Sequence, residues 1–119
     1  MPEDHAQDFA RLEELAKTKE ELEAKIFKEL GPQLSRILRE TATTLKSREP
    51  HASNVYIYDS KINGRAVYRE SDIKDASEES KLLTKAFAGE VRKQLGIPEK
   101  YVSAEIDKYR ESDVIWRGL

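Results

Sequence analysis

One stretch, from Asp75 to Ile106, constrains the fold most because it reads as a helix that runs into a strand. Apolar residues recur there at three- and four-residue steps, which is the spacing of one buried helical face. These residues are Leu82, Leu83, Ala86, Phe87, Val91 and Leu95. Asp75 and Glu78 predict a capping box at the start of the helix. Gly96 and Pro98 predict its end, because glycine favours the left-handed cap and proline prevents continuation.

Beyond Pro98 the apolar period changes from helical to alternating, which is typical of a strand with one buried face. The alternating positions are Val102, Ala104 and Ile106. We expect this third strand to span residues 100–108. A short fourth strand is expected at residues 114–117, after a turn.

The N-terminal part reads as helix. From Ala6 to Leu30 the chain is rich in strong helix formers and carries a narrow apolar stripe that Lys19 interrupts. The stripe consists of Phe9, Leu12, Leu15, Ala16, Leu22, Ile26 and Leu30. A narrow stripe suits a coiled-coil seam, or a helix lying on a surface. Gly31-Pro32 predicts a break, with a second helix over residues 32–46; one long kinked helix is the alternative.

Two further strands are expected at residues 54–59 and 65–70. Between them lies Asn63-Gly64, which is the strongest short hairpin signal because both central residues of a type I′ turn need positive φ. This turn would place Tyr58 opposite Arg69. The element order from the N-terminus is then helix, helix, strand, strand, helix, strand, strand.

This order predicts a two-layer α+β fold, with helices packed on a four-stranded, mostly antiparallel sheet and a long charged N-terminal helix. We expect two parts: residues 1–31 as an amphipathic arm or cover, and residues 32–119 as a compact α+β domain. Strand alternation places Val55, Ile57 and Tyr68 on the inner face of the sheet.

The opposite sheet face collects most of the tyrosines, which makes it a candidate binding surface because tyrosine and arginine are favoured at interfaces. Its candidate binding residues are Tyr56, Tyr58, Arg69, Tyr101 and Tyr109. Two interpretations remain open. Either the N-terminal helix folds over this face and the rings are ordinary packing, or the face is open and binds a partner.

The composition argues against most catalytic chemistry. The chain has 119 residues and no cysteine, so disulfides and thiolate chemistry are excluded. Only His5 and His51 are available, without the spacing of a zinc site, and no glycine-rich phosphate loop is present. We therefore expect no enzymatic activity, no metal and no cofactor. The absence of a signal peptide and of a long apolar run predicts a soluble, cytoplasmic protein.

Charge offers an alternative function. Charged residues make up 37% of the chain, yet the net charge is only −2. Residues 31–70 hold seven basic and four acidic side chains, whereas residues 1–30 hold five basic and nine acidic ones. The basic segment 36–69 could contact phosphates, so a nucleic-acid-associated regulator is the second hypothesis.

The segment from Ser80 to Tyr109, with Leu95-Gly96-Ile97-Pro98 leading into an alternating strand, resembles the helix-to-strand passage of tautomerase-superfamily domains. In that family, activity depends on an N-terminal proline that opens a strand. Pro2 here precedes a predicted helix, so the resemblance implies no catalytic residue in this chain.

The preferred hypothesis is a small, non-enzymatic protein-interaction module. It would bind a protein partner, or a second copy of itself, through the N-terminal helix and the tyrosine-rich sheet face. An adaptor, an inhibitor or immunity protein, or an assembly chaperone would each fit these features, and no membrane contact is expected.

Overall fold

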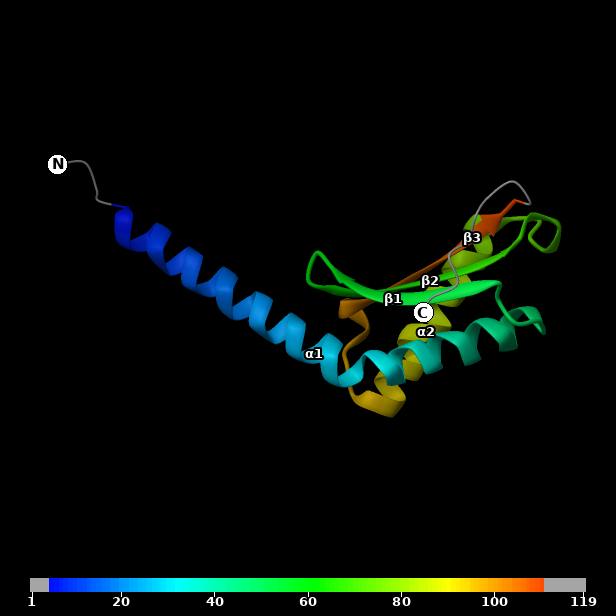
Figure 1. The fold of residues 1–119 in the computed structure, drawn as a ribbon, viewed down its shortest axis with the longest axis horizontal. Helices are drawn as coiled ribbons and strands as arrows, with labels where there is room; N and C mark the ends of the chain where they lie inside the picture. The colour runs from blue at the N-terminus through cyan, green and yellow to red at the C-terminus, as the bar shows by residue number, and fades with distance from the viewer. Residues whose placement is uncertain (1–4, 111–119) are drawn as a thin grey trace.

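The computed structural model describes residues 5–110. Their elements, in chain order, are α1 (Ala6–Lys46), β1 (Ala52–Tyr58), β2 (Lys61–Arg69), α2 (Ala76–Leu95) and β3 (Val102–Tyr109). Short 3₁₀ turns precede α2 and β3, at Glu70–Asp72 and Glu99–Tyr101. Figure 1 shows a twisted sheet with both helices on one side, while the N-terminal part of α1 extends away from the domain. The α+β class is therefore confirmed.

The predicted break at Gly31-Pro32 is wrong, because α1 continues through Pro32 as one helix. Pro32 removes one backbone hydrogen bond and crowds the carbonyl four residues earlier, which bends a helix without necessarily ending it. Figure 1 shows the change of direction in the cyan part of α1, so the kinked-helix alternative is confirmed. Core packing from Leu34 onward holds the helix on one side of the proline. Strong helix formers extend it on the other.

The predicted hairpin turn at Asn63-Gly64 is also wrong. The turn residues are Asp59 and Ser60, with φ of 51° and 60°, and both residues lie inside the left-handed region that a type I′ turn requires. Tyr58 consequently pairs with Lys61, not with Arg69.

Gly64 lies in the middle of β2 for a packing reason. A Cβ on Gly64 would lie 2.8 Å from Leu38 Cδ1 of α1 and 3.2 Å from Phe87 Cε2 of α2. The glycine therefore lets both helices approach the sheet, and turn propensity does not decide its place.

The sheet differs from the predicted four-stranded, mostly antiparallel arrangement. Within residues 5–110 it has three strands in the order β1-β2-β3, with β1 antiparallel and β3 parallel to β2. The parallel pair follows from the connection, because α2 forms the crossover that parallel neighbours need. The predicted fourth strand, residues 114–117, lies outside the described residues.

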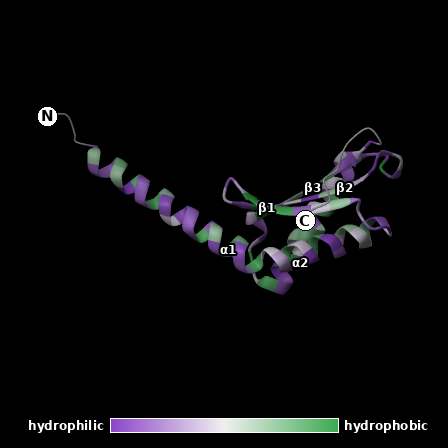
Figure 2. Cartoon of the chain, viewed as in Figure 1, coloured by the Kyte–Doolittle hydropathy of each residue, from purple (hydrophilic) through white to green (hydrophobic). Residues whose placement is uncertain are grey.

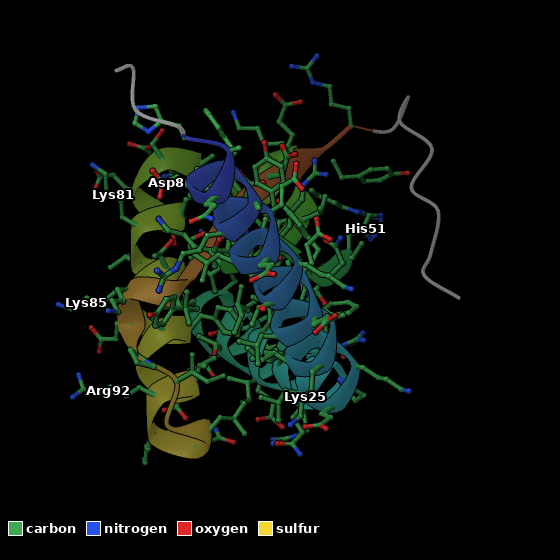
Figure 3. All side chains as sticks on the ribbon, turned by 90° about the vertical axis from the view of Figure 1, so that its left-hand side faces the viewer. Asp8, Lys25, His51, Lys81, Lys85 and Arg92 are labelled. Atoms are coloured by element: carbon green, nitrogen blue, oxygen red, sulfur yellow. The ribbon has the colours of Figure 1, made fainter. Side chains whose placement is uncertain are left out.

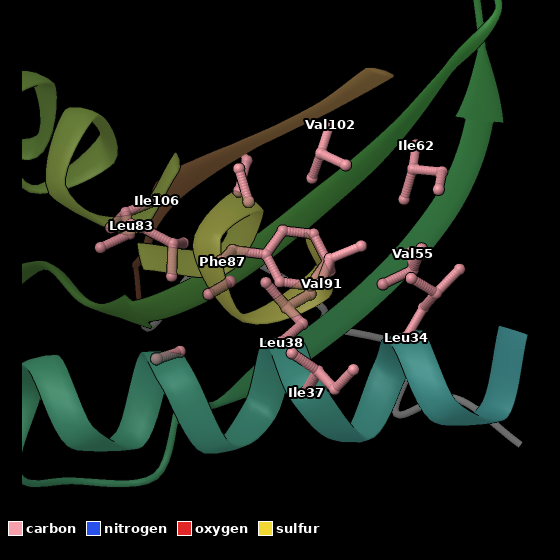
Figure 4. Close-up of a cluster of buried hydrophobic side chains, with 14 of the residues drawn as sticks. Leu34, Ile37, Leu38, Val55, Ile62, Leu83, Phe87, Val91, Val102 and Ile106 are labelled. Atoms are coloured by element: carbon pink, nitrogen blue, oxygen red, sulfur yellow. The ribbon is translucent and has the colours of Figure 1, made fainter. Parts of the chain in front are cut away.

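One face of this sheet carries the core (Figure 4). Leu34, Ile37 and Leu38 of α1 meet Leu83, Phe87 and Val91 of α2 over Val55, Ile62, Val102 and Ile106 of the strands. Tyr68 also points inward, as predicted, and its hydroxyl donates a hydrogen bond to the Ala42 carbonyl of α1.

The predicted positions of both ends of α2 are confirmed, but the capping box is confirmed only in its first half. The Asp75 side chain accepts hydrogen bonds from the N–H groups of Ser77 (3.0 Å) and Glu78 (3.2 Å). The Glu78 carboxylate accepts a hydrogen bond from Lys81 (3.4 Å). Gly96 takes the left-handed conformation, with φ of 72°, at the C-terminal cap.

Hydroxyl groups of α2 occupy the outer edge of β3. Ser80 accepts a hydrogen bond from the Ile106 N–H (2.8 Å), and Thr84 accepts one from the Ala104 N–H (3.2 Å). The Ser80 hydroxyl also donates a hydrogen bond to the Ile106 carbonyl, and the Thr84 hydroxyl donates one to the Ala104 carbonyl. These bonds satisfy backbone groups that would otherwise be free to pair with a strand of another chain.

We predict that Gly64→Ala lowers the free energy of unfolding by about 1–3 kcal/mol, because the new methyl group displaces the buried ends of Leu38 and Phe87. Urea denaturation followed by circular dichroism measures the change. Gly89→Ala is the matched control, since its Cβ meets nothing within 4 Å in mid-helix. This control should gain roughly 0.5–1 kcal/mol. Equal effects of the two substitutions would contradict the packing role of Gly64.

A second prediction concerns alkaline pH. Burial raises the pKa of Tyr68 to about 12, from an ordinary value of about 10. A folded-state pKa above the unfolded one stabilises the fold fully below about pH 10, and the contribution is lost as the pH rises towards 12. Tyr68→Phe should therefore lose less stability than wild type over this interval. At neutral pH it should be about 1 kcal/mol less stable. Tyr58→Phe, at a tyrosine that is 72% exposed, is the matched control for removal of a hydroxyl that is not buried.

Candidate functional site

The N-terminal part of α1, which we call the arm (Ala6–Leu30), exposes a row of large apolar side chains. Phe9, Leu12, Leu15, Leu22, Ile26 and Phe27 are each between 38% and 65% exposed. Figure 2 shows hydrophobic segments recurring along this part of the helix among hydrophilic ones. Isolated exposed apolar residues are ordinary, whereas a contiguous row of them is unusual, so the arm is a candidate interaction surface.

Burial changes sharply where the arm meets the domain. From His5 to Glu29 every residue is exposed except the half-buried Glu23, whereas Gly31 and Leu34 are buried. The predicted division of the chain into residues 1–31 and 32–119 falls near this change, although the helix itself is continuous. Figure 3 looks from the side of the arm and shows its charged side chains, such as Asp8 and Lys25, projecting outward.

A groove of about 610 Å³ lies between the arm and the nearest end of the domain, and we call it the arm groove. One wall is the arm, and the other consists of the β1–β2 turn and the α2–β3 loop. Its apolar lining consists of Leu15, Leu22, Ile26, Ile57, Ile62, Ile97 and Pro98. The groove is open along the arm and is wide enough to accept apolar side chains of a partner.

Glu23 is the half-buried acid of this groove. Its Oε1 atom is buried and accepts no hydrogen bond from the described part of the chain. Lys19, one turn earlier, holds its ammonium 4.0 Å from the same oxygen. A buried carboxylate oxygen without a hydrogen-bond donor is costly, so this position could take a further donor or cation besides Lys19.

The second surface is the sheet face opposite the core, which we call the outer face. Neither helix covers it, because α1 and α2 both pack on the other side. The first of the two interpretations of this face therefore does not hold, because the arm does not fold over the outer face. Tyr56 and Tyr58 lie on β1 at 37% and 72% exposure.

The five predicted binding residues do not form one cluster. Tyr56 and Tyr58 lie near the β1–β2 turn, whereas Arg69 and Tyr109 pair with each other at the far end of β2 and β3. Tyr56 pairs with Asn63, and Asn63 lies six residue steps along the strand from Arg69, or roughly 20 Å.

Tyr101 and Tyr109 lie at opposite ends of the sheet. Tyr101 belongs to the 3₁₀ turn before β3 and lines the arm groove, with the Lys100 ammonium 5.0 Å from its ring centroid. The Tyr109 ring lies 4.3 Å from the His51 ring, measured between centroids. The rings therefore contribute to two separate places, one beside the arm groove and one at the far end of the sheet.

Between these two groups, the outer face is polar. Arg65 donates a hydrogen bond to Asp107, and Ser103 donates one to Asn63 (2.8 Å). The Arg65 guanidinium, with the Lys108 backbone N–H, holds the pKa of Asp107 below its ordinary value. Sequence reasoning missed the Asn63–Ser103 pair because the incorrect hairpin register placed Asn63 in a turn. It missed the Arg65–Asp107 pair because the sequence does not give the register between β2 and β3.

The described part of the chain, residues 5–110, contains no group of three or more His, Cys, Asp and Glu residues that could hold a metal ion. No helix within it is both long and apolar enough to cross a membrane. Comparisons with protein-family models, curated proteins and solved structures found no match, so the tautomerase resemblance gains no support.

We predict that Arg65→Gln raises the pKa of Asp107 towards its ordinary value, because the principal hydrogen bond to the carboxylate is lost. Carboxyl-detected NMR titration measures this pKa. The lowered pKa stabilises the fold above the ordinary carboxyl range, and the contribution is lost as the pH falls through the folded-state value. Since both groups are 45% exposed, the effect on stability should be small. Arg48→Gln, which removes a pair with Asp72, is the control and should not move Asp107.

Proposed function

We propose that this protein is a small, non-enzymatic interaction module that binds a protein through its arm, with the tyrosines beside the β1–β2 turn as additional contacts. An adaptor, an inhibitor or immunity protein, and an assembly chaperone are the kinds of role that fit. The row of exposed apolar side chains on the arm is the single observation that carries the proposal.

The shape of the surface supports this proposal. An amphipathic helix that presents anchors at three- and four-residue steps is a common mode of protein recognition. The arm groove adds a second apolar wall, with Ile57, Ile97 and Tyr101 facing the arm's leucines. Apolar centres with polar rims are typical of protein interfaces, and the lysines and glutamates of the arm supply such a rim.

The nucleic-acid hypothesis has weaker support. Many cations of segment 36–69 form ion pairs with carboxylates within the fold, which reduces the charge available to phosphates. These pairs are Arg36–Glu40, Arg39–Glu49, Lys46–Glu79, Arg48–Asp72 and Arg65–Asp107. Glu105 is also exposed on the outer face and would repel a phosphate backbone.

Photo-crosslinking in the source cells tests the proposal. A benzophenone amino acid at Leu15, within the apolar row, should give a discrete adduct with a protein, either a second copy or another chain. The same probe at Lys17, which helical spacing places on the opposite side of the arm, is the matched control. An adduct from Leu15 alone supports the proposal. Absence of any protein adduct at Leu15, or equal adducts at both positions, would contradict it.

A further inference from the structure

We propose that the partner of the arm is a second copy of this chain, and that two arms pair antiparallel, each lying in the arm groove of the other. This inference rests on the proposed function and names its partner. The arrangement follows from the spacing of the groove residues, from the charge at Glu23 and from the position of the exposed residues near the N-terminus.

The spacing of the arm residues along the seam is the same in both directions. Leu15, Lys19, Leu22 and Ile26 line the groove at steps of four, three and four residues. A two-fold axis between residues 20 and 21 would place Leu15 opposite Ile26 of the second copy. It would also place Lys19 opposite Leu22 of the second copy. A closed two-fold dimer requires such a self-complementary patch.

Charge complementarity fits the same alignment. Lys19 would stack its aliphatic stem on Leu22 of the second copy and reach Glu23 of that copy, one residue further along. Glu23 Oε1 is the buried acceptor that receives no hydrogen bond in the described chain. Two symmetric Lys19–Glu23 pairs between copies would satisfy both of these oxygens. Lys19, which interrupts the apolar stripe, then becomes the residue that sets the register.

The two most exposed apolar residues of the arm also find a place. With the axis between residues 20 and 21, Phe9 and Leu12 lie level with the part of the second copy where its arm joins its domain. Figure 1 shows the α2–β3 loop beside that part of α1. Ile97 and Pro98 of this loop line the groove, and they would cover Phe9 and Leu12.

The groove also supplies what a short two-helix pair lacks. The arm rises about 37 Å at 1.5 Å per residue, which is near the lower limit of length for a coiled coil. In the groove each arm also contacts the β1–β2 turn and the α2–β3 loop. This second wall adds buried area towards the roughly 800 Å² per partner of a stable interface.

Sedimentation velocity of the full chain over a wide concentration range tests the dimer. Wild type should sediment as a dimer, and Leu15→Glu, which would place a carboxylate against Ile26 of the second copy, should raise the dissociation constant by at least about 30-fold, the threshold of a central interface residue. Leu82→Glu is the matched control, because Leu82 is an exposed helical leucine (51%, against 58% for Leu15) outside the arm. A monomeric wild type, or equal effects of the two substitutions, would overturn the proposal. Circular dichroism verifies that each variant remains folded.

Disulfide mapping tests the orientation, since the chain has no native cysteine. In the double variant Leu15→Cys and Ile26→Cys, the antiparallel pair should form bonds between position 15 of one copy and position 26 of the other. The two positions cannot join within one helix, being about 16 Å apart along its axis. Bonds between identical positions indicate parallel arms and overturn the antiparallel arrangement, as does the absence of any bond.

The two proposals can fail separately. If the protein is a monomer and the probe at Leu15 captures a different protein, the second copy is excluded as the partner while the interaction function stands. If the protein is a monomer and the probe captures nothing, both fail.

Discussion

The close approach of two helices to one strand, at Gly64, determines what the rest of the molecule exposes. Leu38 of α1 and Phe87 of α2 both lie against the position that a Cβ would occupy. Because both helices use the same sheet face, the core is one-sided. The opposite face is left to polar pairs such as Arg65–Asp107, and the arm extends beyond the sheet. The candidate binding surfaces are therefore the parts that a one-sided core does not use.

Features set by neighbouring residues could be predicted from the sequence. The Asp75 cap, the Gly96 terminus and the inward orientation of Tyr68 all follow from spacing within a single element. Alternation likewise assigned Tyr56 and Tyr58 to the side away from the core. It could not show that Arg69 and Tyr109 lie roughly 20 Å from them, because that separation depends on the register between strands.

Features decided by distant residues could not be predicted in the same way. Asn63-Gly64 has strong turn propensity, but Gly64 is needed beneath Leu38 and Phe87, and the turn falls on Asp59-Ser60 instead. Pro32 likewise has the local character of a helix break, yet packing of Leu34 and its neighbours keeps α1 continuous. The parallel pairing of β2 with β3 follows from α2 lying between them in sequence. A crossover connection therefore indicates more about strand direction than any residue in the strands.

The helical stability of the arm and its proposed binding of a partner are linked. The buried half of α1 nucleates the helix, so each arm residue adds one hydrogen bond without a new nucleation cost. Pro32 weakens that continuity by removing a bond at the junction. Within the arm, a pair such as Lys19–Glu23 contributes only about 0.3–0.5 kcal/mol. Little besides intrinsic propensity then holds the arm helical in a single chain. If a partner covers Leu15 and Leu22, as we propose, it would stabilise the helix and the complex together, so that ordering of the arm and its association would form one equilibrium.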